Sequence, residues 1–346
     1  MATLQELLSR LVEHDDLTTE ETAAVMDLVL TDNASPVVMG AFLAALRVKR
    51  ETPAEVAGLA SAMLAHAIRI EVPGRCVDVV GTGGDGYNTV NVSTMAALVV
   101  AGAGLTVVKH GNRGATSMSG SADVLGELGV RLDLPPERVA ELAAEVGITF
   151  CFAQVFHPAM RHAMPIRKEI GIPTTLNILG PLTNPAQPAA SAIGSSSLRV
   201  SPVMAGVLAE QGREGLVFHG DDGLDELAPT GAASIWEARG GGVTELRLDP
   251  VADLGLSRIT IDDIRGGDAA ANAEVVREVL AGRGGAARET VLLNAAAGIV
   301  ADGTLPGTAS GTIVERFAAG LRHAEQAIDS GSAAAVLERW VAATAE

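Results

Sequence analysis

The sequence predicts an α/β protein made of a small all-helical domain and a larger domain with a mostly parallel central sheet. Residues 1 to about 70 carry only helical patterns of apolar residues. From Cys76 onward, short β-branched runs alternate with helical stretches, which is typical of βαβ units. A glycine-rich turn after the first of these runs places the expected ligand site at the carboxyl edge of the sheet.

Four short helices are expected in the N-terminal part. Leucines at helical spacing between residues 4 and 11 predict the first helix. The second begins at Thr18, which forms a capping-box pattern with Glu21. Pro36 and Pro53 each follow a hydroxyl residue and start the third and fourth helices, because proline suits the first helical position.

The strands of the larger domain are predicted by short apolar runs. Five of these runs form the expected parallel part, at residues 76–80, 105–109, 148–152, 190–194 and 215–219. Two more runs, 233–238 and 243–248, flank a glycine-rich turn and predict a hairpin, so part of the sheet is expected to be antiparallel. The Ala-rich tail from about 270 to 346 predicts helices.

Prolines crowd residues 157–188 and interrupt the α/β pattern. Such density favours short helices and extended crossings, so this segment is expected to return to the helical unit. The predicted small domain is therefore discontinuous, residues 1–72 plus about 157–188. The large domain takes about 73–156 plus 189–346.

Composition and charge limit the partners. Of the 346 residues 48% are apolar, and the formal net charge is −17, which argues against nucleic acid or an anionic membrane as the main partner. A small phosphate ligand needs only a local group of donors and is not excluded. Cys76 and Cys151 lie in apolar runs and are expected to stay reduced, and the N-terminus does not resemble a signal peptide. We therefore expect a cytoplasmic protein.

The glycine turn has the properties of a phosphate cradle. Gly81-Thr82-Gly83-Gly84-Asp85 follows the first predicted strand, and a helix begins near Ser93. Glycines let backbone N–H groups approach an anion, and the positive end of the helix lies at the same place. The turn matches neither the P-loop nor the dinucleotide-binding spacing.

A second cluster of anion donors follows the strand predicted at 105–109. Residues 109–117 hold a lysine, an arginine, several hydroxyls and glycines, and residues 119–123 add two serines at a helix start. In so acidic a chain this local excess favours an anion site over an ordinary capped loop.

An acidic loop predicts a metal site. Asp221, Asp222, Asp225 and Glu226 place four carboxylates in six residues, where they repel one another unless a cation binds. Oxygen ligands suit Mg²⁺, which usually combines one or two carboxylates with substrate phosphates. The loop alone fits a solvated acidic segment equally well, and the phosphate cradle elsewhere favours metal.

Residue type alone predicts no catalytic or ligand-binding role for the remaining candidates. Arg167 is expected to be a surface residue of a helix. A structural or hydrogen-bonding role is favoured for the histidines His110, His157, His162 and His219.

Taken together, these motifs resemble the anthranilate phosphoribosyltransferase family. The resemblance runs in family order from about 75 to 231, through Gly81–Asp85, Asn91–Thr94, Lys109–Arg113, Ser119–Asp123, His157–Arg161, Asn177–Pro185 and Gly223–Glu226. It implies transfer of phosphoribose from phosphoribosyl pyrophosphate (PRPP) to the amino group of anthranilate, with release of pyrophosphate. It also implies Mg²⁺, with two ions bound alongside PRPP, and a homodimer formed through the helical domain. The active site is then expected in the cleft between the small and the large domain.

The resemblance also implies the site residues. Lys109, Asp225 and Glu226 are expected to be catalytic, Ser93, Asp225 and Glu226 to bind metal, and Gly81, Asn112 and Arg167 to contact anthranilate, whose carboxylate suits a guanidinium. The residues expected to contact PRPP are Gly81, Gly84, Asp85, Thr89, Asn91, Val92, Ser93, Thr94, Lys109, His110, Gly111, Asn112, Arg113, Gly114, Ala115, Thr116, Ser117 and Ser121.

Two alternatives share this fold. One is a pyrimidine nucleoside phosphorylase-like enzyme, which uses phosphate as the nucleophile and differs at the glycine turn. The other is a non-catalytic phosphoribosyltransferase-like nucleic-acid-binding protein, which the net charge of −17 and the retained Asp225-Glu226 pair disfavour.

Overall fold

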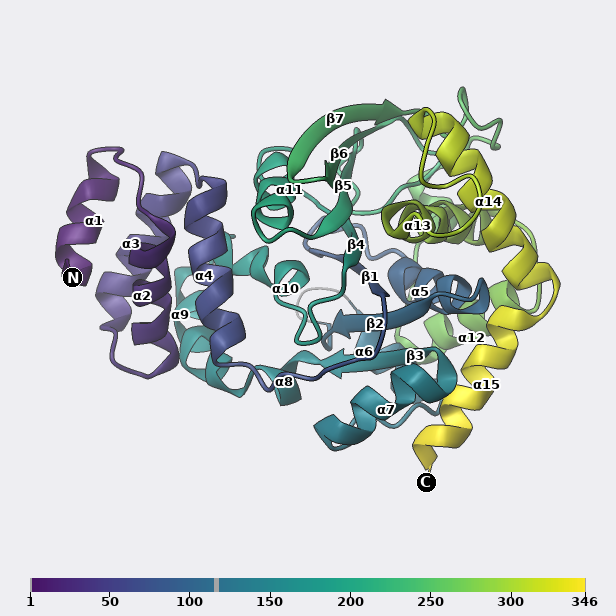
Figure 1. Ribbon diagram of the computed structural model, residues 1–346, viewed down its shortest axis with the longest axis horizontal. Helices are drawn as coiled ribbons and strands as arrows, with labels where there is room; N and C mark the ends of the chain where they lie inside the picture. The colour runs from purple at the N-terminus through teal and green to yellow at the C-terminus, as the bar shows by residue number, and fades with distance from the viewer. Residues whose placement is uncertain (1, 115–117, 346) are drawn as a thin grey trace.

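The computed structural model describes residues 2–114 and 118–345 (Figure 1). Four helices form one end of the molecule, as expected: α1 (Leu4–Val12), α2 (Thr19–Leu30), α3 (Pro36–Lys49) and α4 (Pro53–Ala65). Helix α2 packs against α4, and α1 packs against α3. The predicted capping box at Thr18 forms, and Pro36 and Pro53 occupy the first helical positions.

A seven-stranded sheet forms the centre of the larger part. Its strands are β1 (Cys76–Gly81), β2 (Thr106–Gly111), β3 (Ile148–Phe152), β4 (Ala190–Gly194), β5 (Glu214–Gly220), β6 (Ala233–Arg239) and β7 (Gly242–Leu248). They lie in the order β3-β2-β1-β4-β5-β6-β7, and the first five are parallel. Strands β6 and β7 form the predicted antiparallel hairpin at one edge. The predicted strands and fold class are therefore confirmed.

Helices cover both faces of the sheet. On one face, α5 (Val92–Gly102) and α13 (Ala286–Asp302) pack on the central strands, and α14 (Ile313–Asp329) and α15 (Ser332–Ala345) pack on α5 in turn. On the other face, α11 (Ser201–Glu210) packs on β5 to β7 and also contacts α4. The remaining helices of this part are α6 (Ser121–Glu127), α7 (Pro136–Val146) and α12 (Ala269–Leu280), with a short 3₁₀ turn at Ile261–Ile264. The two faces bury two separate hydrophobic clusters.

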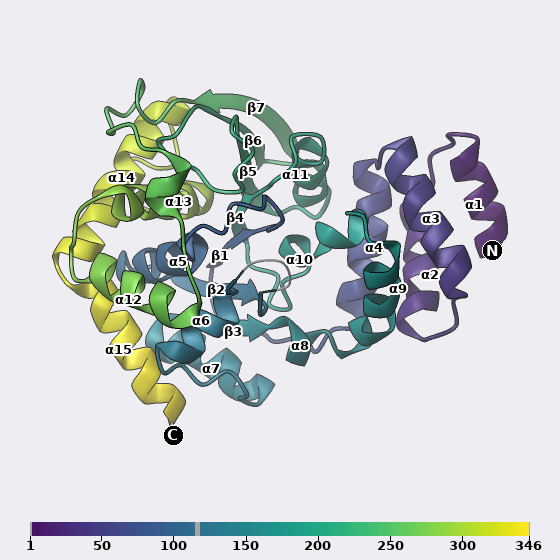
Figure 2. The ribbon, with the colours of Figure 1, turned by 180° about the vertical axis from the view of Figure 1, so that it is seen from behind.

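The proline-rich segment between β3 and β4 runs back toward the helical end, and α9 lies beside α1 to α4 in both views (Figures 1 and 2). Its elements are α8 (Ala153–Phe156), a 3₁₀ helix Pro158–His162, α9 (Ala163–Ile170), a 3₁₀ turn Thr175–Asn177 and α10 (Leu179–Leu182). Helix α9 packs against α3, and the 3₁₀ helix packs against α2. We therefore propose that residues 157–188 belong with residues 1–72, as the proline density suggested.

An ion pair formed by a buried glutamate links the helical end to the sheet. Glu51, between α3 and α4, accepts a hydrogen bond from the Thr175 hydroxyl at 3.0 Å and pairs with Arg199, which follows β4. In the described part of the chain, no helix has both the length and the apolar character needed to cross a membrane.

Candidate active site

The glycine turn lies at the carboxyl end of β1, beside the end of β4. Gly83 and Gly84 have φ values of +67° and +85°, which only glycine adopts without strain. The Thr82 N–H donates to the Gly194 carbonyl at 2.9 Å, and the Ser196 hydroxyl donates to the Gly83 carbonyl at 2.8 Å. The turn is thus held against the loop after β4, as expected for a site at the carboxyl edge of a parallel sheet.

Helix α5 begins next to this turn, and within the described residues no side chain caps its N-terminus. Asn91 is its N-cap residue, but its side chain makes no capping hydrogen bond. Instead the Asn91 amide donates to the Ser119 carbonyl at 3.2 Å and accepts from Asn272 at 2.8 Å. The start of α5 therefore suits an anion, and Asn91 joins it to the loop after β2.

Asn272, on α12, was missed by the sequence analysis. It is 2% exposed, and its Oδ1 accepts a hydrogen bond from the Gly267 N–H at 2.8 Å while its amide holds Asn91. The signal that could have found it is an asparagine at a buried position of a helix that is otherwise rich in alanine and valine.

Lys109 lies inside the sheet region with its amine directed at the first strand and at α5. Its Nζ donates to the Val79 carbonyl at 2.6 Å and to the Ser93 hydroxyl at 3.1 Å, and the residue is only 2% exposed. Burial lowers the pKa of Lys109 to about 8, and the nearby Asp78 carboxylate opposes that shift. Lys109 and Ser93, both predicted site residues, are thus brought into direct contact.

Asp123 organises the loop after β2. Its carboxylate accepts hydrogen bonds from the N–H groups of Gly114 and Gly120, each at 2.9 Å, and pairs with Arg113 at 3.0 Å. Burial alone would raise the pKa of Asp123, but these N–H groups and the guanidinium outweigh it and lower the pKa. The predicted contacts Ala115, Thr116 and Ser117 lie outside the described residues.

Two other predicted residues in and beside this loop, Ser121 and His110, contact backbone carbonyl groups. The Ser121 hydroxyl donates to the Asn112 carbonyl at 3.3 Å. The Nδ1 of His110 lies 2.9 Å from the Gly180 carbonyl, and burial lowers the pKa of His110 to about 3. His157 lies against His110, with ring centroids 5.1 Å apart, and burial lowers its pKa to about 4. Both imidazoles are neutral at pH 7, in agreement with the structural role favoured for them.

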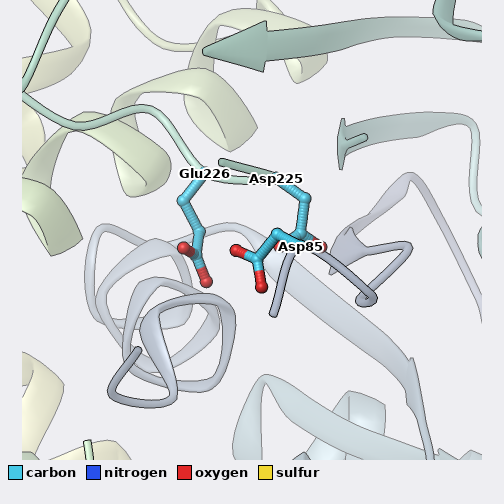
Figure 3. Close-up of side chains that lie close together, drawn as sticks. All are labelled: Asp85, Asp225 and Glu226. Atoms are coloured by element: carbon cyan, nitrogen blue, oxygen red, sulfur yellow. The ribbon is translucent and has the colours of Figure 1, made fainter. Parts of the chain in front are cut away.

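Three carboxylates gather beside the glycine turn (Figure 3). Asp85, Asp225 and Glu226 each offer one oxygen, and these oxygens lie within 4.8 Å of one another. The Gly83 N–H donates to Asp225 Oδ2 at 2.7 Å, and the Thr89 hydroxyl lies 3.1 Å from Glu226 Oε1. This cluster connects the glycine turn to the acidic loop, 142 residues apart in sequence.

Burial and mutual repulsion disfavour the charged forms of this cluster. Burial raises the pKa of Asp225 to about 7, with Asp85 as the next cause. Burial also raises the pKa of Glu226, and the Asp225 carboxylate adds to the shift. A divalent cation with oxygen ligands would relieve both effects, so these residues fit Mg²⁺.

The acidic loop does not contribute all four of its carboxylates. Asp221 pairs with Arg247, and Asp222 accepts hydrogen bonds from the Thr230 hydroxyl and the Leu224 N–H. Only Asp225 and Glu226 join the cluster, and Asp85 from the glycine turn completes it. Within the described residues, no hydrogen bond joins Ser93, the third predicted metal ligand, to this cluster.

Two glycines allow Asp225 to lie between the ends of β1 and β4. A Cβ at Gly81 would lie 2.4 Å from Asp225 Oδ2, and a Cβ at Gly194 would lie 1.6 Å from the Asp225 carbonyl. Any larger residue at either position would displace the acidic loop. Gly81, a predicted contact, is therefore needed here for close approach.

Arg167 is half-buried on α9, at the helical end. Burial lowers its pKa, and the described residues give it no hydrogen bond or ion pair. By contrast, the Arg199 guanidinium is paired with a buried glutamate. A partly desolvated guanidinium without a protein partner suits an anionic ligand.

Comparison with known proteins gives consistent matches along nearly the whole chain. Residues 5–67 match the helical bundle domain of a glycosyl transferase family, and residues 73–334 match the a/b domain of that family. An anthranilate phosphoribosyltransferase of Arthrobacter sp. (strain FB24) is 58% identical over 99% of this chain and 96% of its own length. One from Nocardioides sp. is 54% identical over the full length of both chains.

Solved structures give the same result. The crystal structure of anthranilate phosphoribosyltransferase from Thermus thermophilus superposes with a TM-score of 0.90 at 40% identity, over 98% of this chain and 99% of that one. The Saccharomyces cerevisiae anthranilate phosphoribosyltransferase in complex with PRPP and Mg superposes with a TM-score of 0.87 at 29% identity, over 99% of this chain and 98% of that one.

Proposed function

This chain belongs to the glycosyl transferase family of the anthranilate phosphoribosyltransferases, and we propose on that premise that it transfers the phosphoribosyl group of PRPP to the amino group of anthranilate. The products are N-(5-phosphoribosyl)anthranilate and pyrophosphate, and the step belongs to tryptophan biosynthesis. Relatives at more than half identity carry this name, which favours it over the phosphorylase and nucleic-acid-binding alternatives.

The observation that carries the proposal is the direct contact between the glycine turn and the acidic cluster. Mg²⁺ bound to Asp225 and Glu226, with Asp85 close by, would neutralise charge on the departing pyrophosphate. The relative from Saccharomyces cerevisiae has been solved in complex with PRPP and Mg, which supports Mg²⁺ as the ion bound here. The expected number of two ions and the expected ligand Ser93 stay predictions.

The residues of the cradle supply binding and orientation. We assign the phosphate groups of PRPP to the glycine turn, the start of α5 and the loop after β2. Lys109 supplies a buried positive charge at the junction of β1 and α5, where it holds Ser93. Because Lys109 and Ser93 are in contact inside the fold, the ammonium group is held in place before the substrate binds. The ammonium group therefore needs no reorganisation as negative charge develops on pyrophosphate.

We place anthranilate beside Arg167, whose guanidinium would bind its carboxylate. The amine of an aniline is neutral near pH 7, so its attack on the ribose carbon needs no strong general base. His110 and His157 are weak bases, because burial lowers their pKa values to about 3 and 4, and the reaction does not need a stronger one. Positioning of the two substrates then supplies much of the rate.

A comparison of two separate reactions tests the proposal. The purified protein is incubated in separate reactions with Mg²⁺, PRPP and anthranilate, or with thymidine and inorganic phosphate, and products are identified by mass spectrometry. We expect phosphoribosylanthranilate and equimolar pyrophosphate only in the first reaction. Release of thymine in the second, with no product in the first, would establish the phosphorylase alternative instead.

We also propose that the helical end forms the interface of a homodimer. Val37 and Val48 on α3 are 81% and 74% exposed and, about three helical turns apart, lie on one side of the helix. Val12 at the end of α1 is 61% exposed. We take these exposed valines as the apolar part of that interface.

Replacing Val37 by Asp is expected to convert the dimer to a monomer, because a buried unpaired carboxylate is costly in an apolar interface. Sedimentation velocity measures the mass. Val243→Asp, at an exposed site on β7 away from the helical end, serves as the matched control and should stay dimeric. If both variants and the parent protein have the same mass, the dimer interface does not lie on this surface.

The cytoplasm is the proposed place of action. Both cysteines are buried and unpaired, which is typical of a protein from a reducing compartment.

A further inference from the structure

A single asparagine lies within the most deeply buried stretch of α13. Asn294 is 3% exposed and lies in a run of α13 in which every residue from Thr290 to Asp302 is buried. Its amide group donates to the Leu227 carbonyl and to the Thr290 carbonyl, both at 2.8 Å. Its Oδ1 accepts a hydrogen bond from the Leu227 N–H at 3.1 Å. The side chain therefore uses both amide hydrogens and its oxygen on backbone groups.

Leu227 is the residue that follows Glu226 directly. Its side chain is fully buried in the core, and the backbone here belongs to neither a helix nor a strand. A buried N–H and C=O outside regular structure need partners, because leaving them unpaired is unfavourable. Asn294 supplies both partners, as a neighbouring strand would. Because the Leu227 N–H belongs to the peptide that joins it to Glu226, the direction of Glu226 is fixed as well.

Other contacts also restrain the acidic pair. The Gly83 N–H and the Thr89 hydroxyl bind the carboxylates, and the glycines that end β1 and β4 confine Asp225. The two hydrogen bonds hold the side chains and Gly194 leaves room for the Asp225 carbonyl, whereas Asn294 binds the main chain directly. Only an amide side chain offers a donor and an acceptor side by side at this length, since Asp lacks the donor and Leu lacks both.

We propose that Asn294 is a positioning residue for the metal-binding pair, a role that rests on the metal site proposed above. Three carboxylates within 4.8 Å repel one another, so a freely moving loop would separate them before a cation arrives. With Leu227 fixed by α13, Asp225 and Glu226 keep their spacing without the ion. Asn294 should therefore act on metal affinity, while the chemical step at saturating metal stays nearly unchanged.

Metal binding is measured directly with Mn²⁺, from the electron paramagnetic resonance signal of the free ion, with PRPP present. Asn294→Ala is expected to raise the Mn²⁺ dissociation constant on the order of tenfold, the usual effect of removing a residue that orients metal ligands. The Mg²⁺ concentration for half-maximal rate should rise by a similar factor. At saturating Mg²⁺, kcat should stay within about twofold of the parent value, since no group that contacts the substrate has changed.

Val291→Ala is the matched control, because Val291 is fully buried on the same helix and has no hydrogen bond to the acidic loop. It should lower the melting temperature through the cavity it leaves, with an unchanged Mn²⁺ dissociation constant. If Asn294→Ala does not fold, Asn294→Ser carries the test, because its shorter hydroxyl cannot bind both the N–H and the C=O of Leu227. Weaker Mn²⁺ binding supports lost positioning, and equal or tighter binding contradicts it.

The outcomes separate this role from the metal site itself. If the parent protein binds Mn²⁺ no more tightly than the variant with Asp225→Asn and Glu226→Gln, the metal site is wrong. The role proposed for Asn294 is then wrong as well. If the parent binds Mn²⁺ and Asn294→Ala binds it equally well while melting earlier, only the positioning role is wrong, and Asn294 is a structural residue.

Discussion

Asp225→Asn combined with Glu226→Gln is expected to lower kcat on the order of a thousandfold, which corresponds to roughly 4 kcal/mol of lost transition-state stabilisation. The reason is that pyrophosphate leaves poorly unless its charge is neutralised, and this pair provides the carboxylates that would hold the ion. Steady-state rates at saturating PRPP, anthranilate and Mg²⁺ give the comparison. Asp221→Asn is the matched control, because Asp221 lies in the same loop but pairs with Arg247 outside the cluster.

The same double variant is expected to be more stable than the parent protein when metal is removed. Folding raises the pKa of Asp225 to about 7 and also raises that of Glu226, so the parent loses stability as the pH rises through these values. Thermal melts in EDTA should therefore show the largest difference near pH 8 and little difference near pH 3, where both carboxyls are mostly protonated whether folded or not. Wild-type kcat together with identical melts at both pH values would contradict the assignment of a metal site.

Arg167→Ala is expected to raise the KM for anthranilate by about 10- to 100-fold, since a lost charge-assisted pair costs about 1.5–3 kcal/mol. The KM for PRPP should barely change, because the phosphate cradle lies on the sheet and Arg167 lies on α9. Kinetics with each substrate varied in turn separate the two constants. The guanidinium is half-buried and unpaired among the described residues, so its removal leaves no protein partner uncompensated.

Two further variants sharpen this test. Lys168→Ala removes a neighbouring exposed cation of the same helix and should leave both constants unchanged. Arg167→Lys keeps the charge without the planar fork and should give an intermediate KM for anthranilate. If Arg167→Ala raises both KM values equally, Arg167 supports the bound conformation in general and does not bind the carboxylate.

Local sequence patterns were sufficient for the fold class and for the strands, though not for the order of the strands in the sheet. The seven strands and the four N-terminal helices follow from hydrophobic periodicity, capping boxes and prolines at first helical positions, all of which act within a few residues. The glycine turn was also predictable, because strand, glycines and helix follow one another along the chain. Two of its residues have positive φ values, and the glycines at these positions in the sequence indicate that requirement.

Contacts between distant segments were not predictable in the same way. Asp85 joins Asp225 and Glu226 only because β1, before the glycine turn, and β5, before the acidic loop, both lie beside β4 in the sheet. No local pattern distinguishes Asp85 from the other acidic residues. Asp221 and Asp222 looked equivalent to Asp225, but Arg247 and Thr230 from later segments bind them. The amides of Asn272 and Asn294 reach site residues 181 and 67 positions away.

Anthranilate fluorescence tests the central claim most directly. Anthranilate is fluorescent, and its consumption can be followed continuously after PRPP and Mg²⁺ are added to the purified protein. We expect the signal to fall only when protein, PRPP and Mg²⁺ are all present, to stop on addition of EDTA and to resume with excess Mg²⁺. A signal that stays constant in the complete mixture, from a protein that is folded by circular dichroism, would contradict the proposed function.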